Sequence, residues 1–156
     1  MPYSDLRDFL QLLEKKGLLH KIKVDVDPIL EISEITDRMS KSLNGGNALY
    51  FEKVKGSSIP VVTNIFGSFD RMCLALEVER LDDVGKRIEK LFNQSPPKSF
   101  KEKIKTFFEF IEISKYLPKK VKDAPCQEVI DNKPDLSKLP ILKTWPLDGG
   151  RFITLP

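Results

Sequence analysis

The chain has 156 residues, of which 40% are hydrophobic and 31% charged, a composition typical of one water-soluble folded domain. Its 26 basic and 23 acidic residues nearly balance, so the net charge of +3 does not indicate a nucleic-acid partner. The N-terminus lacks the apolar core of a signal peptide, and no apolar run reaches the roughly 20 residues of a membrane span.

Cysteine and histidine are too scarce for two common structural devices. Two cysteines make no disulfide framework, and one histidine with two cysteines cannot furnish a structural zinc site. We therefore expect a protein of the reducing cytoplasm, with His20 a surface residue of a strand.

The first elements are a helix and a strand. Ser4 can cap a helix whose apolar positions recur at helical spacing, and Gly17 stands where a glycine would end it. Leu18 to Val26 then alternates as a half-buried strand does, which predicts that Ile22, Val24 and Val26 share the buried face.

A second helix and two more strands follow. Asp27 and Pro28 are a capping residue and a first-turn proline, so we expect the helix to begin there. Its predicted buried stripe is Ile32, Ile35, Met39 and Leu43, and Asn44-Gly45-Gly46 should end it. Residues 48–54 and 59–66 are predicted to pair as strands across a short connection.

The remaining chain divides into two short helices, a long helix and an arm. Ser68 is expected to cap a helix through Leu76, and Asp82 or Asp83 to open another through Phe92. Beyond Pro96-Pro97, residues 99–117 have the pattern of a long amphipathic helix, and prolines then punctuate short extended pieces. The fold class predicted is α/β (α+β): a compact mixed-sheet domain over residues 1–93, a linker and amphipathic helix over 94–122, and an extended arm over 123–156.

Several segments are candidate functional sites. The lysines of residues 98–122 could face a membrane or a nucleic acid, but interleaved glutamates and the absence of arginine favour a solvated helix face. Gly45-Gly46 belongs to no phosphate-binding glycine pattern and is interpreted as a helix terminator. Cys126 has no histidine or adjacent basic residue to activate it, so both it and Cys73 are predicted to be buried or structural thiols.

The acidic pairs have a structural interpretation as well. Glu31/Glu34 and Asp82/Asp83 fall in predicted first turns of helices, where they complement the helix dipole. Asp148, in "DGG", is predicted to be a turn residue. The residues alone therefore predict no catalytic, cofactor-binding or metal-binding site in this chain.

Taken together and in order, the motifs resemble the UbiD-type decarboxylases. The segments that carry the resemblance are "SDLRDFLQLLEKKGLLHKI", "VDPILEISEITDR", "GGNALYFEKVKGSSIPVVTNIFGS", "ERLDDVGKRIEKL", "APCQEVI" and "DLSKLPILKTWPLDGGRFITLP". Each is weak alone, but they cover essentially the whole chain with sensible spacing. The chain is similar to the N-terminal part of such an enzyme.

The resemblance implies a reversible, non-oxidative decarboxylase of aromatic or α,β-unsaturated carboxylic acids, with quinone biosynthesis as the expected setting. The full-length family uses prenylated FMN with Mn²⁺ and K⁺, and a flavin prenyltransferase supplies the cofactor. It also implies a homo-oligomer when full length, no nucleic acid, and at most peripheral contact with a membrane.

Little of the family's machinery carries over to these residues. Its metal-binding Asn, His and Glu and its catalytic Arg and acidic residues lie beyond the DGG turn, in a split β-barrel similar to flavin reductases. Only residues 148–155 match the entry strand of that barrel, so we expect no activity and no bound cofactor for this chain alone. We also expect residues from about 143 onward to be poorly ordered or held by another copy. The alternative is a short regulatory or assembly subunit that completes a split decarboxylase in trans.

Overall fold

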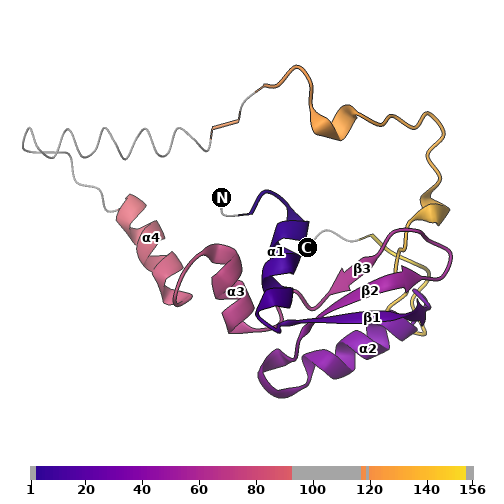
Figure 1. Cartoon of the computed structure of the whole chain (residues 1–156), viewed down its shortest axis with the longest axis horizontal. Coiled ribbons are helices and arrows are strands. Elements are labelled where there is room, and N and C mark those ends of the chain that lie inside the picture. Colours follow the sequence, from indigo (N-terminus) through magenta and orange to yellow (C-terminus); the bar gives the residue numbers. More distant parts are fainter. Residues whose placement is uncertain (1–2, 93–116, 119, 154–156) are drawn as a thin grey trace, which may run out of the picture. The chain divides into compact units, whose positions relative to one another are not determined.

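The computed structural model describes residues 3–92, 117–118 and 120–153 (Figure 1). The chain forms two compact units, one of Met1–Gly85 with Asp135–Pro156 and one of Lys86–Pro134. The predicted helix over 99–117 and the lysine-rich segment 98–122 lie almost wholly outside the described residues.

The first unit is built on a mixed three-stranded sheet. β1 (Leu19–Val26), β2 (Ala48–Val54) and β3 (Val61–Thr63) lie side by side in chain order. β1 and β2 are parallel, which requires a crossover, and helix α2 (Glu31–Ser40) supplies it. β2 and β3 are antiparallel across a short connection, as predicted, although β3 is shorter than the predicted run.

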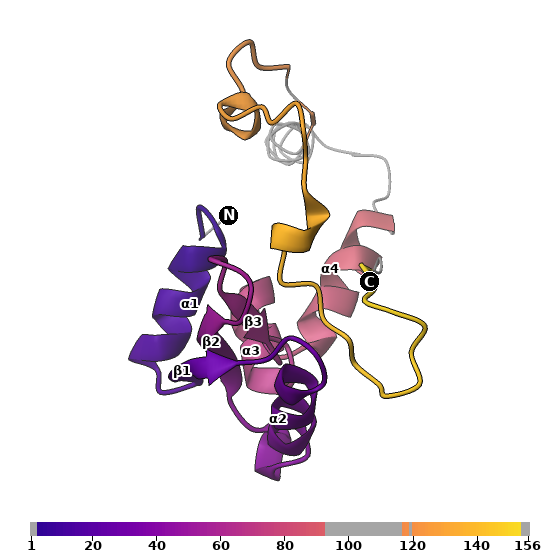
Figure 2. The same ribbon diagram turned by 90° about the vertical axis from the view of Figure 1, so that its right-hand side faces the viewer.

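Helices cover both faces of this sheet. Leu49 and Phe51 of β2 belong to one core cluster with Ile32 of α2. Ala48 belongs to a second cluster with residues of α1 (Leu6–Lys15), and α3 (Phe69–Leu76) packs there too. Figure 2 shows α1 and α2 on opposite sides of the strands. Alternation along β2 thus creates the layers of the predicted α/β fold.

Helix α1 begins one residue later than predicted. Asp5, not Ser4, is the N-cap, and its side chain accepts a hydrogen bond from the Asp8 amide. Ser4 donates instead to the Asp8 carboxylate through both its amide and its hydroxyl. Gly17 follows the helix at a φ of +69°, as expected of a terminating glycine.

The predicted buried face of β1 is wrong at Val24, whose side chain is 68% exposed. Ile22 pairs with Phe51 and Asp25 with Lys53, so three steps along β1 match two along β2. This bulge breaks the alternation and turns Val24 outward. Exposed His20, in the same strand, is on the surface as predicted.

Helix α2 departs from prediction at both ends. It begins at Glu31 rather than Pro28, because residues 28–30 pair with another part of the chain. It ends at Ser40, and Leu43 falls in a 3₁₀ turn, η1 (Leu43–Gly45), where it is 90% exposed. Ile32, Ile35 and Met39 do pack into the core, as predicted.

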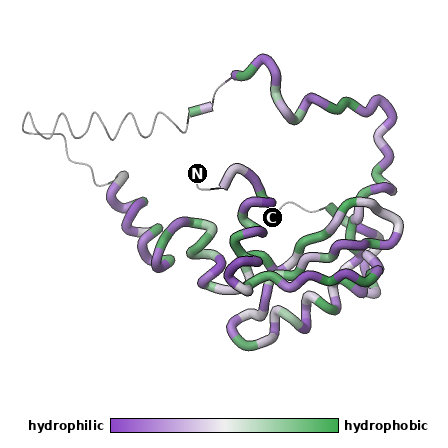
Figure 3. The backbone as a smooth tube through the Cα atoms, in the orientation of Figure 1, coloured by the Kyte–Doolittle hydropathy of each residue, from purple (hydrophilic) through white to green (hydrophobic). Residues whose placement is uncertain are grey.

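The helices predicted after the sheet are confirmed. The Ser68 hydroxyl caps α3, and α4 (Asp82–Phe92) has Asp82 and Asp83 in its first turn. The arm holds two 3₁₀ turns, η2 (Pro125–Gln127) and η3 (Leu136–Lys138), so it is less extended than predicted. Figure 3 shows hydrophobic and hydrophilic residues interspersed along it.

The arm from residue 135 belongs to the same unit as the sheet. Leu142 packs against the core cluster of α2 and β2, and Lys143 forms a parallel bridge with Ile29. The Ser57 hydroxyl also donates to the Lys138 carbonyl at 2.8 Å. The expectation that residues from about 143 onward are poorly ordered or held by another copy is therefore wrong at Lys143, which pairs with Ile29 of the same chain.

The predicted strand at 151–155 is not formed by its described part. Residues 151–153 are exposed and have no strand partner among the described residues. A β-strand is stable only with a neighbour to satisfy its backbone groups, which explains the difference.

Candidate functional site

The most highly organised polar feature of the described chain surrounds Arg71, which is only 1% exposed. Its guanidinium donates to three backbone carbonyls, those of Ile65 at 3.0 Å, Gly46 at 2.6 Å and Asn64 at 3.1 Å. Burial lowers the pKa of Arg71, and the Asp70 carboxylate partly opposes this change. Arginine stays charged in proteins, so this is a buried cation held by carbonyl dipoles.

Asn64 completes the same network from the end of β3. Its side-chain amide donates to the carbonyls of Gly45 at 2.8 Å and Asn47 at 2.9 Å. Asn64 itself has a φ of +54°, a conformation that Asn tolerates better than most residues. We call Gly45–Asn47, Asn64–Gly67 and Arg71 the loop hub.

The glycines of the loop hub permit its close packing. A Cβ added to Gly45, whose φ is +78°, would lie 1.7 Å from the Gly67 carbonyl oxygen. A Cβ on Gly67 would lie 1.9 Å from the Asn64 side-chain oxygen. The prediction that Gly45-Gly46 ends the second helix is wrong, because α2 ends at Ser40 and Gly46 instead follows the 3₁₀ turn η1. The two glycines are a site of backbone contact between two loops.

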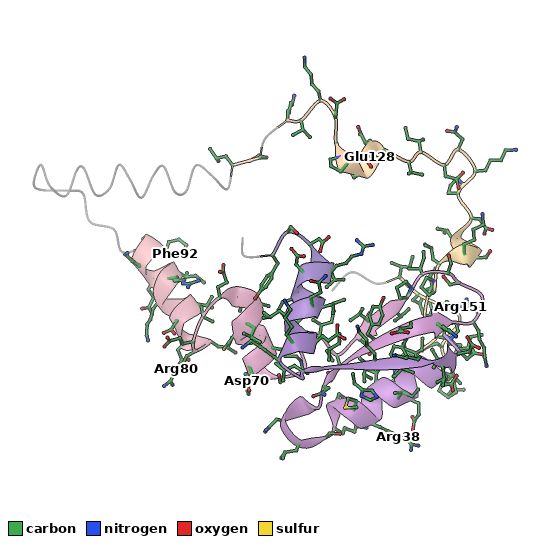
Figure 4. The ribbon with its side chains drawn as sticks, viewed as in Figure 1. Arg38, Asp70, Arg80, Phe92, Glu128 and Arg151 are labelled. Atoms are coloured by element: carbon green, nitrogen blue, oxygen red, sulfur yellow. The ribbon has the colours of Figure 1, made fainter. Side chains whose placement is uncertain are left out.

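A pocket of about 580 Å³ adjoins the loop hub at the start of α3. Its walls include Gly45, Gly67 and Ser68 together with Phe66 and Phe69, which are 58% and 76% exposed. Asp70, labelled in Figure 4 in the first turn of α3, also lines it. The size suits a small ligand, but the lining offers neither a nucleophile beside a base nor a cluster of cations.

A second pocket, of about 680 Å³, lies between α2, β3 and the arm. Ser33 lines it, and its hydroxyl is buried without a hydrogen-bond partner in the described structure. The Thr36 and Thr63 hydroxyls lie 2.8 Å apart and link α2 to β3 beside it. Trp145 contributes a ring that is 64% exposed. These groups can position the arm, but they supply no acid–base pair.

The acidic residues predicted to have structural roles lie where the sequence indicates. Glu31 and Glu34 lie in the first turn of α2, as predicted. Asp148 forms the predicted turn, accepting from the Trp145 amide at 2.9 Å and donating its own amide to the Trp145 carbonyl.

The two cysteines differ in their exposure. Cys126, predicted to be a buried or structural thiol, is exposed rather than buried, because the described residues around it form no core. Cys73 is half-buried within α3.

The residues described do not fit a metal or flavin centre. Among residues 3–92, 117–118 and 120–153 there is no group of three or more His, Cys, Asp or Glu side chains placed to hold a metal ion. Arg71, the one buried cation of the described residues, is fully engaged with carbonyls and is not available to a phosphate. Within the same ranges, no helix is long and apolar enough to cross a membrane.

Two family models match this chain. The model of the 3-octaprenyl-4-hydroxybenzoate carboxy-lyase N-terminal domain matches residues 10–91. The model of the Rift-related domain of the same carboxy-lyase matches residues 119–156. The chain belongs to the UbiD family. The resemblance seen in its motifs is thereby confirmed.

Relatives and solved structures similar to this chain were also found. Uncharacterized proteins of Archaeoglobus fulgidus and Aquifex aeolicus are each 48% identical, over 100% and 97% of this chain. The closed form of Sedimentibacter hydroxybenzoicus vanillic acid decarboxylase is 30% identical, with a TM-score of 0.67 over 96% of this chain and 29% of that one. An evolved dimeric form of the UbiD-class enzyme HmfF from Pelotomaculum thermopropionicum, in complex with prFMN, is 29% identical, with a TM-score of 0.50 over 61% of this chain and 21% of that one.

The match is to part of longer proteins. The chain spans 31% and 32% of the length of the Archaeoglobus and Aquifex relatives. The mixed sheet with its flanking helices is thus the fold of a UbiD N-terminal domain.

Sequence reasoning missed the loop hub. A signal was present in "NIFGSFDRMCLAL", where Arg71 is the one basic residue of an otherwise acidic-to-apolar short helix, three residues after its cap. Such an arginine is a candidate for burial against loop carbonyls. Only the fold, however, shows that Gly46 lies within its reach.

Proposed function

We propose that this chain is the N-terminal domain and connecting arm of a UbiD-type decarboxylase. The parent reaction is the reversible, non-oxidative decarboxylation of an aromatic or α,β-unsaturated carboxylic acid, in the cytoplasm and in quinone biosynthesis. The observation that carries the proposal is the match of both family models, in order, along residues 10–91 and 119–156.

In this proposal, prenylated FMN, Mn²⁺ and K⁺ bind the remainder of the enzyme. Bound to an HmfF neighbour, prFMN is the cofactor of another member of the class. The proposed partners are that remainder, a flavin prenyltransferase as supplier, and further copies of the full-length enzyme. We also propose the division into a domain of residues 1–93, a linker of 94–122 and an arm of 123–156.

The part played by the described residues is then structural. The loop hub fixes the turn between β3 and α3, and the core beneath α2 receives Leu142 of the arm. The Asp148 turn aims the backbone at Arg151 and the residues that follow. The chain's own task is therefore to hold the start of the next domain in place.

A decarboxylation assay tests the proposal. The purified chain, given prenylated FMN, Mn²⁺, K⁺ and a panel of aromatic and α,β-unsaturated acids, should release no carbon dioxide. The same chain continued through the remaining two-thirds of a relative's length should release it. Decarboxylation by the chain alone would overturn the assignment of the chemistry to the remainder.

The intact mass of the natural gene product separates the proposal from its alternative. A product about three times this length supports a domain of a larger enzyme. A natural product of 156 residues that restores activity to a separately expressed remainder would instead establish a subunit acting in trans.

A further inference from the structure

The start of α2 holds an unusual backbone turn. Leu30 has φ +71° and ψ −39°, and the Glu31 amide donates to the Ile29 carbonyl at 2.9 Å. A hydrogen bond across three residues with a positive central φ is the classic γ-turn, which is rare and strained for a residue with a Cβ. A leucine here must be held by something else.

The arm holds this turn. The Leu30 amide donates to the Lys143 carbonyl at 2.9 Å, and the Lys143 amide donates to the Pro28 carbonyl at 3.1 Å. These two bonds form the parallel bridge between Ile29 and Lys143. Beside them, Leu142 is anchored in the hydrophobic core.

The same segment carries every local signal for a longer helix. Asp27 already accepts from the Ile29 amide at 2.8 Å, the bond of an N-cap to the second helical residue. Pro28 has the fixed φ favoured at the first helical position. Leu30, with its positive φ, lies outside the helical region of backbone space, and Ile29 is held in the bridge to Lys143.

The Pro28 carbonyl has one hydrogen-bond partner in the structure and would have another in a longer α2. The Pro28 carbonyl accepts from Lys143 in the structure, whereas in a helix beginning at Pro28 it would accept from the Ile32 amide, four residues on. The Ile32 amide instead reaches the Asp27 carbonyl at a long 3.3 Å. Docking of the arm and a longer α2 therefore differ in the partners of the Pro28 carbonyl and in the backbone conformation of Leu30.

We infer that the Asp27–Glu31 segment is a clasp with two states. With the arm docked, Leu30 is held in the γ-turn and α2 begins at Glu31. With the arm released, Leu30 relaxes to a right-handed conformation and α2 begins at Pro28. Because residues 119–156 match the Rift-related domain, the clasp couples the position of that domain's first segment to the length of α2.

Two substitutions at Lys143 test the clasp from the arm side. Lys143→Pro removes the amide that bonds Pro28, whereas Lys143→Ala keeps both backbone bonds. In the 156-residue chain, the ¹³Cα shifts of Ile29 and Leu30 should move to helical values in Lys143→Pro and stay unchanged in Lys143→Ala. Unchanged shifts in the proline variant, or equal changes in both, would overturn the inference.

Two substitutions at Leu30 test the clasp by changing the γ-turn itself. They do not depend on how well the Lys143→Pro variant folds. Leu30→Gly and Leu30→Ala both remove the side chain, but only glycine accepts a positive φ without strain. Amide hydrogen exchange at Lys143 should be about five-fold or more slower in Leu30→Gly than in Leu30→Ala, since relief of the strain favours docking. Equal exchange rates would show that arm and turn are not coupled.

Discussion

The sheet region of the first unit and its arm are made of similar residues but are stabilised in different ways. In the sheet region, Phe51, Leu13 and Ile32 have no exposed surface. In the arm, Leu147 is 97% exposed and Trp145 64%, although both are as apolar as the core residues. The sheet region buries its own hydrophobic surface, whereas the arm is placed by a few contacts that the sheet region provides.

This difference follows from chain topology. The crossover from β1 through α2 to β2 brings apolar side chains from nearby segments onto both faces of one strand. The arm after Pro118 has 3₁₀ turns and one isolated bridge in its described part, so no regular face exists there to bury. Because some residue types occur in both regions, matched substitutions can test the contrast directly.

The largest effect is expected for the phenylalanines. Phe51→Ala should lower the free energy of unfolding by about 3–5 kcal/mol, because it leaves a cavity in the centre of the sheet. Phe152→Ala, at a ring 57% exposed, should change it by less than about 0.5 kcal/mol. Urea unfolding followed by circular dichroism measures both, and equal losses would mean that the arm is as integral to the fold as the sheet.

The arginines give an intermediate effect. Arg71→Met should lower the free energy of unfolding by roughly 2–4 kcal/mol, since three loop carbonyls lose their donors. Arg151→Met should be nearly neutral, because Arg151, labelled on the arm in Figure 4, is exposed. Thermal unfolding of the two variants measures how much stability each has lost. A stable Arg71→Met protein would show that water replaces the guanidinium and that the loop hub does not depend on it.

The residues that sequence could place are those governed by local rules. The helical spacing of Phe9, Leu10 and Leu13 requires no knowledge of the rest of the fold, and neither does the cap of α3 by Ser68. The family resemblance was also accessible, since ordered motifs along the whole chain carry it.

The residues that sequence misplaced depend on distant partners. Val24 turns outward because β2 sets the register of a bulge, and Leu30 leaves the helix because Lys143 bonds its amide. Arg71 is buried because a loop 25 residues earlier offers its Gly46 carbonyl. Local patterns mark Arg71 as a candidate for burial but cannot reveal its distant partners, so the loop hub could not be predicted in full.

The smallest effect is expected for two serine–aspartate pairs, one in each region. Hydrogen bonds from Ser4 lower the pKa of Asp8 from its ordinary 3.8, and hydrogen bonds from Ser137 lower that of Asp135 in the same way. A lowered carboxyl pKa stabilises the folded state above the ordinary pKa, and this contribution is lost as the pH falls through the folded value. Ser4→Ala should therefore raise the pKa of Asp8 toward 3.8 and leave the pKa of Asp135 unchanged. Ser137→Ala should raise the pKa of Asp135 and leave the pKa of Asp8 unchanged.

Carboxyl ¹³C shifts followed between about pH 2 and 6, a range on either side of the ordinary aspartate value of 3.8, measure both pKa values in each variant. Both serines also keep an amide that bonds the same carboxylate, so part of each shift should survive the loss of the hydroxyl. If the sheet region is the more firmly held, Asp8 should keep its lowered pKa in urea concentrations that already return Asp135 to the ordinary value. Simultaneous loss in both would place the arm and the sheet in one cooperative unit, and the contrast between them would then lie in burial alone.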